Sequence, residues 1–353
     1  MSRFLQLHLL TFFPPANLNR DDTARPKTAV VGGATRLRLS SQALKRAWRT
    51  SDIFSSALAG HMGERTQRLG EVVRAHLLAG GMDDATALPI AREIASVFGK
   101  VKNIKDDHPA QTEQLAFISP DERQAALAVA DQALKGKKID VKVASLLRGT
   151  DTAADIALFG RMLADNPSYN RDAAAQVAHA ITTHKVTVED DFYTAVDDLK
   201  TPAEDAGAGF LGEAAFGSGV FYLYLCIDLV LLIRNLEGDK ALAATTLTAL
   251  AQAAATTAPR GKQNSFAAHG RAGYVLAERG GQQPRTLAGA FACPVTGNDL
   301  MEASIQALIS FRTAIDKTYG PAADARVEMQ LGGEKTLADV LAFVGEGVPC
   351  PTT

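Results

Sequence analysis

The chain has 353 residues, of which 46% are hydrophobic and 22% are charged, so it can bury a sizeable core in about two domains or one elaborated domain. Its net charge of -2 and its pI near 6.4 exclude a uniformly basic nucleic-acid binder, so any binding of that kind must use a local groove. The three cysteines, Cys226, Cys293 and Cys350, are odd in number and widely spaced, which indicates neither a disulfide framework nor a zinc site.

No stretch of the sequence has the length and apolarity expected of a signal peptide or a membrane span. The N-terminal run RFLQLHLLTFF is interrupted by Gln6 and His8 and is followed by two prolines. The longer run VFYLYLCIDLVLLI contains Asp228 and ends at Arg234. We therefore expect a cytoplasmic protein with no membrane partner.

In chain order, the first element is a strand over residues 3–11, where leucines alternate with other residues until Pro14 and Pro15 end it. A basic loop that runs into a helix follows, between Asn17 and Arg49, with only two acidic residues, Asp21 and Asp22. Its eight basic residues are Arg20, Arg25, Lys27, Arg36, Arg38, Lys45, Arg46 and Arg49. This local excess of six positive charges leaves a net charge of -8 for the other residues. Charge that is segregated in this way usually faces a partner.

Residues 40–57 have the pattern of an amphipathic helix that Ser40 or Ser41 can cap. Its apolar stripe holds Leu44, Ala47 and Trp48. Its opposite stripe holds Gln42, Lys45, Arg46 and Arg49. The serines, the first-turn N–H groups and the helix dipole would together favour an anion, which makes this a candidate phosphate-binding edge. An ordinary amphipathic helix with a solvated basic face has the same pattern, so both interpretations stay open.

The remaining elements define the fold class. Residues 61–169 are helical in pattern and alanine-rich, which predicts a helical insertion. We expect strands at 177–184, 220–227 and 273–279, extended segments at 285–291 and 325–331, and helices at 239–257, 299–318 and 337–344. Without the insertion and an acidic tract at 189–219, the order is strand, helix, strand, strand, helix, strand. This order predicts an α/β (α+β) fold on the split β-α-β plan of ferredoxin-like and RNA-recognition domains.

The acidic, glycine-rich tract contains apolar residues, and a tract of this length in a compact domain is usually functional or mobile. These residues are Phe192, Tyr193, Val196, Phe210 and Leu211. They either form an apolar wedge on an extended arm or anchor a long loop to its own domain. A second loop, residues 259–273, brings in the basic side chains of Arg260, Lys262 and Arg271.

Catalytic signatures are weak. The sequence has no P-loop, no strand-linked GxGxxG and no GxSxG motif. His179 and His184 are five residues apart in a predicted strand, so they point to opposite faces and cannot easily share a metal. Asp21 and Asp22 are stronger candidates, because adjacent carboxylates beside a basic patch could hold Mg²⁺ for phosphodiester cleavage. The same aspartates could instead orient Arg20 or bond the loop backbone. We expect no metal site, no catalytic residue and no cofactor.

Six motifs occur in the same order in one known family. They are NLNRDD, RLRLSSQALKRA, DIALFGRM, HAITTHKVTVEDDFYTAVDDL, FGSGVFYLY and GKQNSFAA. On these motifs the sequence resembles the CasC family, the backbone subunits of type I-E CRISPR Cascade complexes, over nearly the whole chain. Residues 61–151 match the family only in their general helical character, and not in specific motifs. The resemblance implies an RNA-recognition-like palm at 1–60 and 170–353, helical fingers at 61–169, and a thumb at 189–218 within the palm.

The resemblance also implies roles for individual residues. Contacts to RNA phosphates are implied for Arg20, Lys27, Ser40, Gln42, Lys45 and Arg49. Two further RNA-binding candidates are Arg46, on the basic face of the helix, and Lys262, in the GKQNSFAA loop. Met162 resembles a residue that touches bases. The implied wedge of the thumb includes Phe192, Tyr193, Thr194, Val196, Phe210 and Leu211.

The implied function is that of a non-catalytic subunit of an antiviral complex. Copies would polymerise along the guide crRNA beside other Cascade subunits, and they would present its bases to target DNA. Phosphate contacts suit this role, because they leave the base edges free to read the target. Two alternatives stay open, a metal-dependent endoribonuclease that uses Asp21 or Asp22 and a general single-strand-binding protein. The second alternative should stack bases on aromatic side chains, yet only 6% of residues are aromatic.

Overall fold

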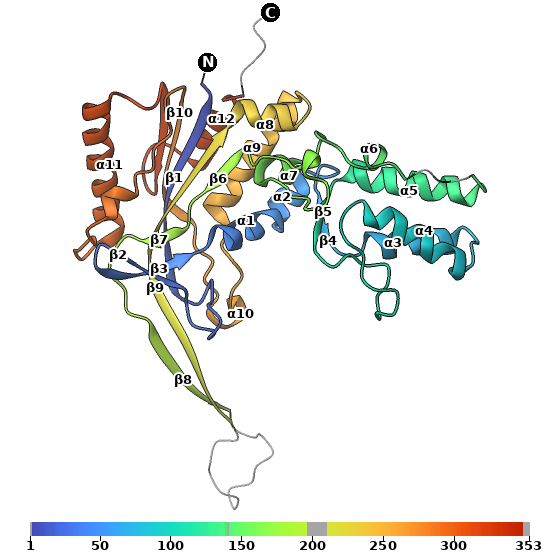
Figure 1. Cartoon of the computed structure of the whole chain (residues 1–353). Helices are drawn as coiled ribbons and strands as arrows, with labels where there is room; N and C mark the ends of the chain where they lie inside the picture. Colours follow the sequence, from blue (N-terminus) through green and yellow to red (C-terminus); the bar gives the residue numbers. More distant parts are fainter. Residues whose placement is uncertain (1, 138, 140, 196–209, 349–353) are drawn as a thin grey trace, which may run out of the picture. The chain divides into compact units, whose positions relative to one another are not determined.

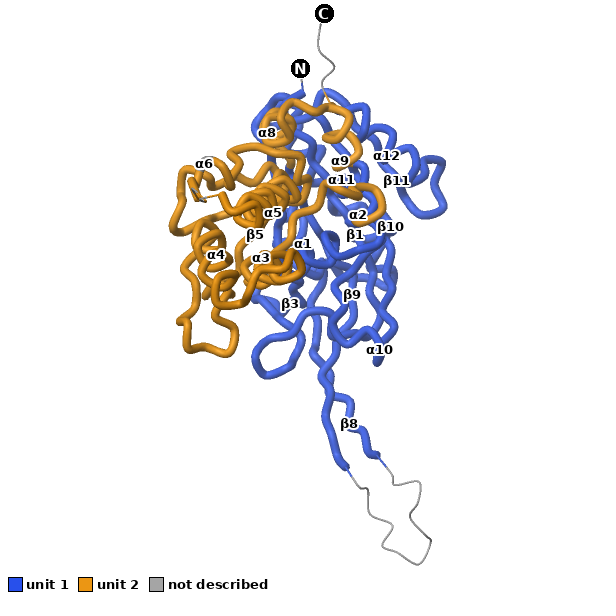
Figure 2. The backbone as a smooth tube through the Cα atoms, turned by 90° about the vertical axis from the view of Figure 1, so that its right-hand side faces the viewer, with its two compact units in different colours: residues 1–54, 177–226, 248–347 blue, residues 55–176, 227–247, 348–353 orange. Residues whose placement is uncertain are grey.

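The computed structural model describes residues 2–137, 139, 141–195 and 210–348. The chain forms two compact units (Figure 2). Unit 1 contains the residues up to 54 together with 177–226 and 248–347, and unit 2 contains 55–176, 227–247 and Val348. The expected insertion at 61–169 lies within the 55–176 segment of unit 2, which also includes residues 227–247.

Unit 1 is built on an antiparallel sheet with the strand order β11-β10-β1-β9-β7-β3-β2, and β6 and β8 also pair with β9 (Figure 1). The strands are β1 (Phe4–Ala16), β2 (Thr28–Val31), β3 (Ala34–Leu39), β6 (Ala175–Val177), β7 (Ala180–Thr182), β8 (Glu189–Ala195), β9 (Phe210–Asp228), β10 (Ala272–Gly280) and β11 (Ala325–Gln330). A sheet of this kind combined with helices confirms the α/β (α+β) class. The closer likeness to an RNA-recognition domain stays a prediction.

Strand β1 is buried on both faces over residues 5–10. One face carries Leu5, Leu7 and Leu9, and the other carries Gln6, His8 and Leu10. The 3-10 turn η2 (Ala288–Phe291) and helix α11 (Leu300–Tyr319) cover the second face (Figure 1), with an apolar cluster that includes Tyr274 and Leu308. Because each fully buried leucine contributes about 1.5–3 kcal/mol, this cluster contributes strongly to the packing of α11 against the sheet.

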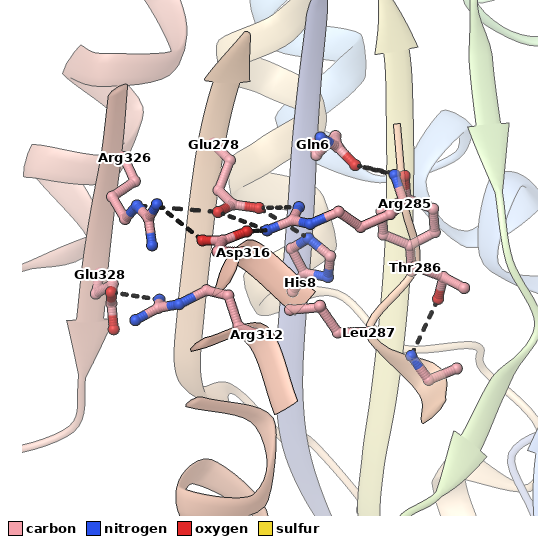
Figure 3. A network of polar contacts seen from close by, with 12 residues as sticks. Gln6, His8, Glu278, Arg285, Thr286, Leu287, Arg312, Asp316, Arg326 and Glu328 are labelled. Atoms are coloured by element: carbon pink, nitrogen blue, oxygen red, sulfur yellow. Dashed lines mark hydrogen bonds and ion pairs between the residues drawn. The ribbon is translucent and has the colours of Figure 1, made fainter. Parts of the chain in front are cut away.

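A network of charged side chains lies on this covered face (Figure 3). Glu278 on β10 is buried and accepts hydrogen bonds from Arg285 at 2.6 and 3.2 Å. Arg285 also donates to Asp316 on α11 at 3.3 Å, and Asp316 accepts from Arg326 on β11 at 3.2 Å. Burial alone would raise the pKa of Glu278, but the contacts with His8 and Arg285 outweigh it and hold that pKa at about 2. The network therefore joins strands β1, β10 and β11 to α11.

Unit 2 contains helices and a two-stranded sheet of β4 (Glu64–Thr66) and β5 (Ala116–Ile118). Its helices are α3 (Leu69–Ala79), α4 (Asp84–Ser96), α5 (Pro120–Leu134), α6 (Val143–Leu146), α7 (Ala154–Phe159) and α8 (Leu229–Asn235), with the 3-10 turn η1 (Pro167–Tyr169). The helices of this unit agree with the predicted helical insertion, but β4 and β5 were missed. Their pairing joins segments about fifty residues apart, which local periodicity does not reveal. In the described residues, no helix has the length and apolarity to cross a membrane.

Two predicted ends of elements were wrong. Strand β1 continues through Pro14 and Pro15, because its pairing with β10 ends at Thr11 and the prolines interrupt no bond of that ladder. The predicted helix at 40–57 divides into α1 (Ser41–Arg49) and α2 (Asp52–Ala57). The hydroxyl of Ser51 donates to the carbonyl of Trp48 at 2.7 Å and accepts from the N–H of Phe54 at 3.3 Å. It therefore ends one helix and starts the next.

Several other segments of the chain differ from the predicted elements. The basic loop contains the hairpin β2–β3, whose turn at Gly32 and Gly33 has φ values of 60° and 73°. The strand expected at 177–184 is divided into β6 and β7. Residues 285–291 do not form the expected extended segment. The hydroxyl of Tyr222 accepts the N–H of Leu287, and the hydroxyl of Thr286 accepts the N–H of Ala288. Helices α9 (Lys240–Thr256) and α12 (Leu337–Gly345) confirm the predictions, and a short helix, α10 (Gln263–Phe266), was missed.

Candidate nucleic-acid interface

Two asparagines hold the basic loop in place. The side-chain amide of Asn17 is buried and donates to the carbonyls of Ala24 and Ala215, both at 2.9 Å. The side-chain oxygen of Asn19 accepts the N–H of Ser40 at 2.8 Å, which ties the loop to the start of α1. Sequence reasoning assigned no role to either asparagine, although both stand in the NLNRDD motif. They position the predicted phosphate contacts of the loop beside the N-terminus of α1.

Helix α1 has the amphipathic pattern that the sequence predicts. Its apolar stripe, Leu44, Ala47 and Trp48, is buried. Gln42 and Arg46 are exposed, and Lys45 and Arg49 are half-buried. The hydroxyl of Ser40 caps the helix by accepting the N–H of Ala43 at 3.3 Å, and its side chain is largely buried. Ser40 therefore shapes the N-terminal end of the helix, while Gln42 and Arg46 of the polar stripe are exposed.

The basic side chains of the loop do not all face solvent. Arg36 is fully buried and donates to the carbonyls of Thr182 at 2.8 Å and Phe291 at 3.0 Å. Burial lowers the pKa of Arg36. Its inclusion in a basic surface was wrong, because partners that lie far away in sequence hold it inside the unit. Arg20 and Lys27 are held by pairing within the loop, and Arg20 is exposed.

The loop around α10 adjoins the same region. A Cβ atom at Gly261 would lie 2.5 Å from the carbonyl oxygen of Asn17 and 2.3 Å from that of Leu18, so only glycine fits this approach. Lys262 follows with a φ of 51° and an exposed side chain. The structure therefore brings Lys262 to the segment that precedes Arg20, as a shared interface requires.

Asp21 bonds the loop backbone. Its Oδ1 accepts the N–H of Thr23 at 2.9 Å, the hydroxyl of Thr23 at 2.8 Å and the N–H of Arg25 at 3.0 Å. The hydrogen bond from the Thr23 hydroxyl is the main cause that lowers the pKa of Asp21. This is one of the two structural roles that the sequence suggested. Asp22 is exposed, and no group of three or more His, Cys, Asp or Glu side chains in the described residues could hold a metal ion.

The acidic tract forms an arm, made of β8 and the first half of β9, that extends from the sheet of unit 1 (Figures 1 and 2). Its pairing places Thr194 opposite Leu211 and Tyr193 opposite Gly212. Because directly paired residues share a face, Phe192 lies on the same face as Leu211, and Tyr193 on the same face as Phe210.

The four large apolar side chains of the arm are 45–62% exposed: Phe192, Tyr193, Phe210 and Leu211. The rings of Tyr193 and Phe210 have centroids 6.2 Å apart. The alternative that these four residues anchor a loop to its own domain was wrong, because they remain open to solvent. Thr194 is also exposed, and Val196 lies outside the described residues.

Met162 lies in unit 2, on a segment fixed by two buried ion pairs. Arg161 donates to Glu122 at 2.5 Å, and Arg171 donates to Asp151 at 2.6 Å. Between these arginines the Met162 side chain is 83% exposed and rims a hollow of about 520 Å³. An exposed methionine on so rigid a segment is a suitable apolar contact for a base.

The described residues of unit 1 define an α/β (α+β) protein with an antiparallel sheet, a helix with a basic face and an exposed apolar arm. The chain belongs to the CT1975-like protein family of Cas proteins, whose model matches residues 5–342. It is similar to a chain of a solved "CRISPR RNA-guided surveillance complex, pre-nicking", with 29% identity and a TM-score of 0.86, over 98% of this chain and 100% of that one. A chain of another "CRISPR RNA-guided surveillance complex" has 25% identity and a TM-score of 0.74, over 98% and 99%. No curated protein matches the chain.

Proposed function

We propose that this protein is a CasC-type backbone subunit of a type I-E Cascade complex, which binds guide crRNA in the cytoplasm without cutting it. Copies of the chain assemble along the guide, beside other Cascade subunits, and present its bases to target DNA. The observation that carries the proposal is the similarity over nearly the whole chain to subunits of RNA-guided surveillance complexes. The exposed basic and apolar side chains described above give this similarity a physical basis.

In this proposal the guide is held by its phosphates. The exposed ends of Arg20, Gln42, Arg46 and Lys262 lie around the loop that Asn17 and Asn19 tie to α1. The first N–H groups of α1 have no intrahelical acceptor and add a positive helix end to this edge. Contacts of this kind carry no base preference, so one protein can hold any guide sequence. The same contacts make the affinity depend on salt.

The arm supplies the apolar contact. Its four exposed side chains project from a two-stranded ribbon, and they suit insertion between bases better than contact with a phosphate. The exposed carboxylate of Asp191 near the base of the arm disfavours the sugar-phosphate backbone there. We infer that the arm reaches the guide held by a neighbouring copy and splays a base out of the pairing. Met162 contacts the bases that remain stacked.

The nuclease alternative is less favoured because Asp21 already satisfies three donors of its own loop. Two labelled single-stranded RNAs of unrelated sequence should bind with equal affinity and stay intact with Mg²⁺. The variants Asp21→Asn and Asp22→Asn should behave like the wild type. Cleavage that depends on Mg²⁺ and is lost in either variant would contradict the non-catalytic role. Equal binding without ordered assembly would favour a general single-strand-binding protein.

A further inference from the structure

Arg38 and His179 form a close pair on the surface of unit 1. Arg38 lies in β3, and His179 precedes β7, the strand that pairs with β3. The guanidinium nitrogen Nη1 of Arg38 lies 2.7 Å from Nδ1 of His179. A guanidinium can only donate hydrogen bonds, so Nδ1 of the ring must accept. His179 is therefore neutral here and carries its proton on Nε2.

A second cationic group, Lys27, adjoins this pair. The N–H of Arg38 donates to the carbonyl of Lys27 at 2.8 Å, which holds Lys27 beside β3. Burial, followed by the charges of Arg38 and Lys27, lowers the pKa of His179. Within the described part of the chain, the charged groups that act on the His179 ring are Arg38 and Lys27, and both are positive. Three basic groups that converge without a carboxylate favour an anion.

The cluster continues the interface described above. Strand β3 ends at Leu39, one residue before the Ser40 cap of α1, and Lys27 is itself a predicted phosphate contact. His179 is exposed, whereas His184 is largely buried and its Nε2 accepts the N–H of Val220 at 3.2 Å. The two histidines therefore have separate roles, and only His179 can reach a ligand at this surface.

We propose that Lys27, Arg38 and His179 form a phosphate site for the guide strand, in which His179 takes up a proton as the phosphodiester binds. The inference rests on the proposed function and adds Arg38 and His179 to its contacts. When a solvent proton binds Nδ1, the ring can no longer accept from Arg38. A phosphate oxygen between them can accept from both donors and restore every hydrogen bond. No covalent bond forms or breaks.

The sign of the pH effect follows from this exchange. The bound anion favours the charged imidazolium, so it raises the pKa of His179 above its value in the free protein. RNA affinity should therefore rise as pH falls through the histidine range, from about pH 7.5 to about pH 5.5 around the ordinary value of about 6.5. One more cation at the phosphates should also steepen the salt slope, the change in log affinity with log salt concentration, by about 0.7 at the lower pH.

The test uses fluorescence anisotropy of a labelled single-stranded RNA with the full chain at both pH values and several salt concentrations. His179→Gln keeps a hydrogen-bond acceptor for Arg38 but cannot take a proton, so it should lose the rise in affinity and the steeper slope. His108→Gln, at an exposed histidine in unit 2, is the matched control and should keep both. Arg38→Gln should bind every RNA sequence more weakly at both pH values.

An NMR titration of the His179 ring, assigned by its loss in the glutamine variant, gives an independent measurement. The pKa of the ring should rise when the RNA is added. The inference is overturned if His179→Gln retains the full pH dependence or if the pKa of the ring does not rise. If the wild type binds no RNA at either pH, the proposed function fails, and this site fails with it.

Discussion

The guanidinium of Arg25 forms a two-point ion pair with the carboxylate of Asp190, at 2.7 Å between Nη1 and Oδ1 and 3.3 Å between Nη2 and Oδ2. Arg25 stands in the basic loop and Asp190 in β8, so the pair joins the proposed phosphate edge to the base of the arm. Both side chains are nearly half exposed. Pairs of this kind contribute only about 0.2–1 kcal/mol to stability, so the effect of this one should be on the direction of the arm.

The first prediction concerns this pair. Arg25→Ala and Asp190→Ala should leave the free energy of unfolding within about 1 kcal/mol of the wild type, yet each should weaken cooperative assembly on RNA. The exchange Arg25→Asp with Asp190→Arg restores opposite charges and should recover part of the cooperativity. Sedimentation of complexes along a long RNA measures it. No loss in either single variant would show that the pair does not orient the arm.

The second prediction concerns the two faces of the arm. Phe192→Ala with Leu211→Ala changes one face, and Tyr193→Ala with Phe210→Ala changes the other. Since all four side chains are exposed, each double variant should change stability by no more than about 0.5 kcal/mol.

Regular spacing of copies on RNA, measured by nuclease protection, should be lost in at least one of these double variants. Phe12→Ala is the control, because Phe12 is an exposed aromatic residue of β1 and belongs to neither strand of the arm. Wild-type spacing in both double variants would show that the apolar side chains of the arm do not act as a wedge between bases.

The third prediction concerns the basic face of α1. If Lys45 and Arg49 each neutralise one phosphate, replacing both with alanine should make the salt slope of RNA binding shallower by about 1.4. The double variant should also bind every RNA sequence more weakly, and to the same extent. Lys317→Ala, at an exposed position of α11, should leave the slope unchanged. A double variant with the wild-type slope would mean that this face makes no phosphate contact.

The fourth prediction separates the buried arginine of the loop from its exposed ones. Arg36→Leu removes the donor from two buried carbonyls, each at a cost of about 1–3 kcal/mol, so it should lower the free energy of unfolding by about 2–6 kcal/mol. Arg46→Leu should change it by no more than about 0.5 kcal/mol. Urea denaturation compares the two variants. Equal effects would contradict the assignment of Arg36 to the core.

The fifth prediction concerns acid stability. Burial lowers the pKa of His8 below 6.5, so the unfolded chain binds more protons and stability should decline as pH falls below that value. Glu278 has a pKa of about 2 in the folded chain, against an ordinary value of 4.5 for a solvated glutamate. Its contribution should be complete above pH 4.5 and should be lost as pH falls toward 2.

Glu278→Gln breaks a buried pair and should cost about 3–5 kcal/mol at neutral pH. Its unfolding free energy should also be flatter than that of the wild type between pH 4.5 and 2. Glu334→Gln, at an exposed position, is the control. Chemical denaturation at several pH values measures all three curves, and identical slopes for Glu278→Gln and wild type would contradict the network.

Much of the fold could be predicted where the signal is local. The stripe of Leu44, Ala47 and Trp48 follows from the period of a helix, whereas the apolar residues of the acidic tract left an exposed arm and an anchored loop equally open. The hairpin β2–β3 was missed although Gly32-Gly33 between alternating residues is a turn signal.

Other features depend on residues that only the fold brings together. Arg36 resembles its neighbour Arg38 in sequence, but the carbonyl of Phe291 that binds it is 255 positions away. The pair between Arg38 and His179 spans 141 positions. Partners that are this far apart in the sequence decide which basic side chains reach the surface. Neither composition nor local periodicity reveals such partners.

The most direct measurement of the central claim is the length of RNA that copurifies with the protein from cells that also express a guide array and the partner subunits. Ordered assembly by a phosphate edge and an arm predicts intact RNA of one discrete length, bound in complexes of one size. RNA of scattered lengths, RNA cut within the bound segment, or protein free of RNA would contradict it.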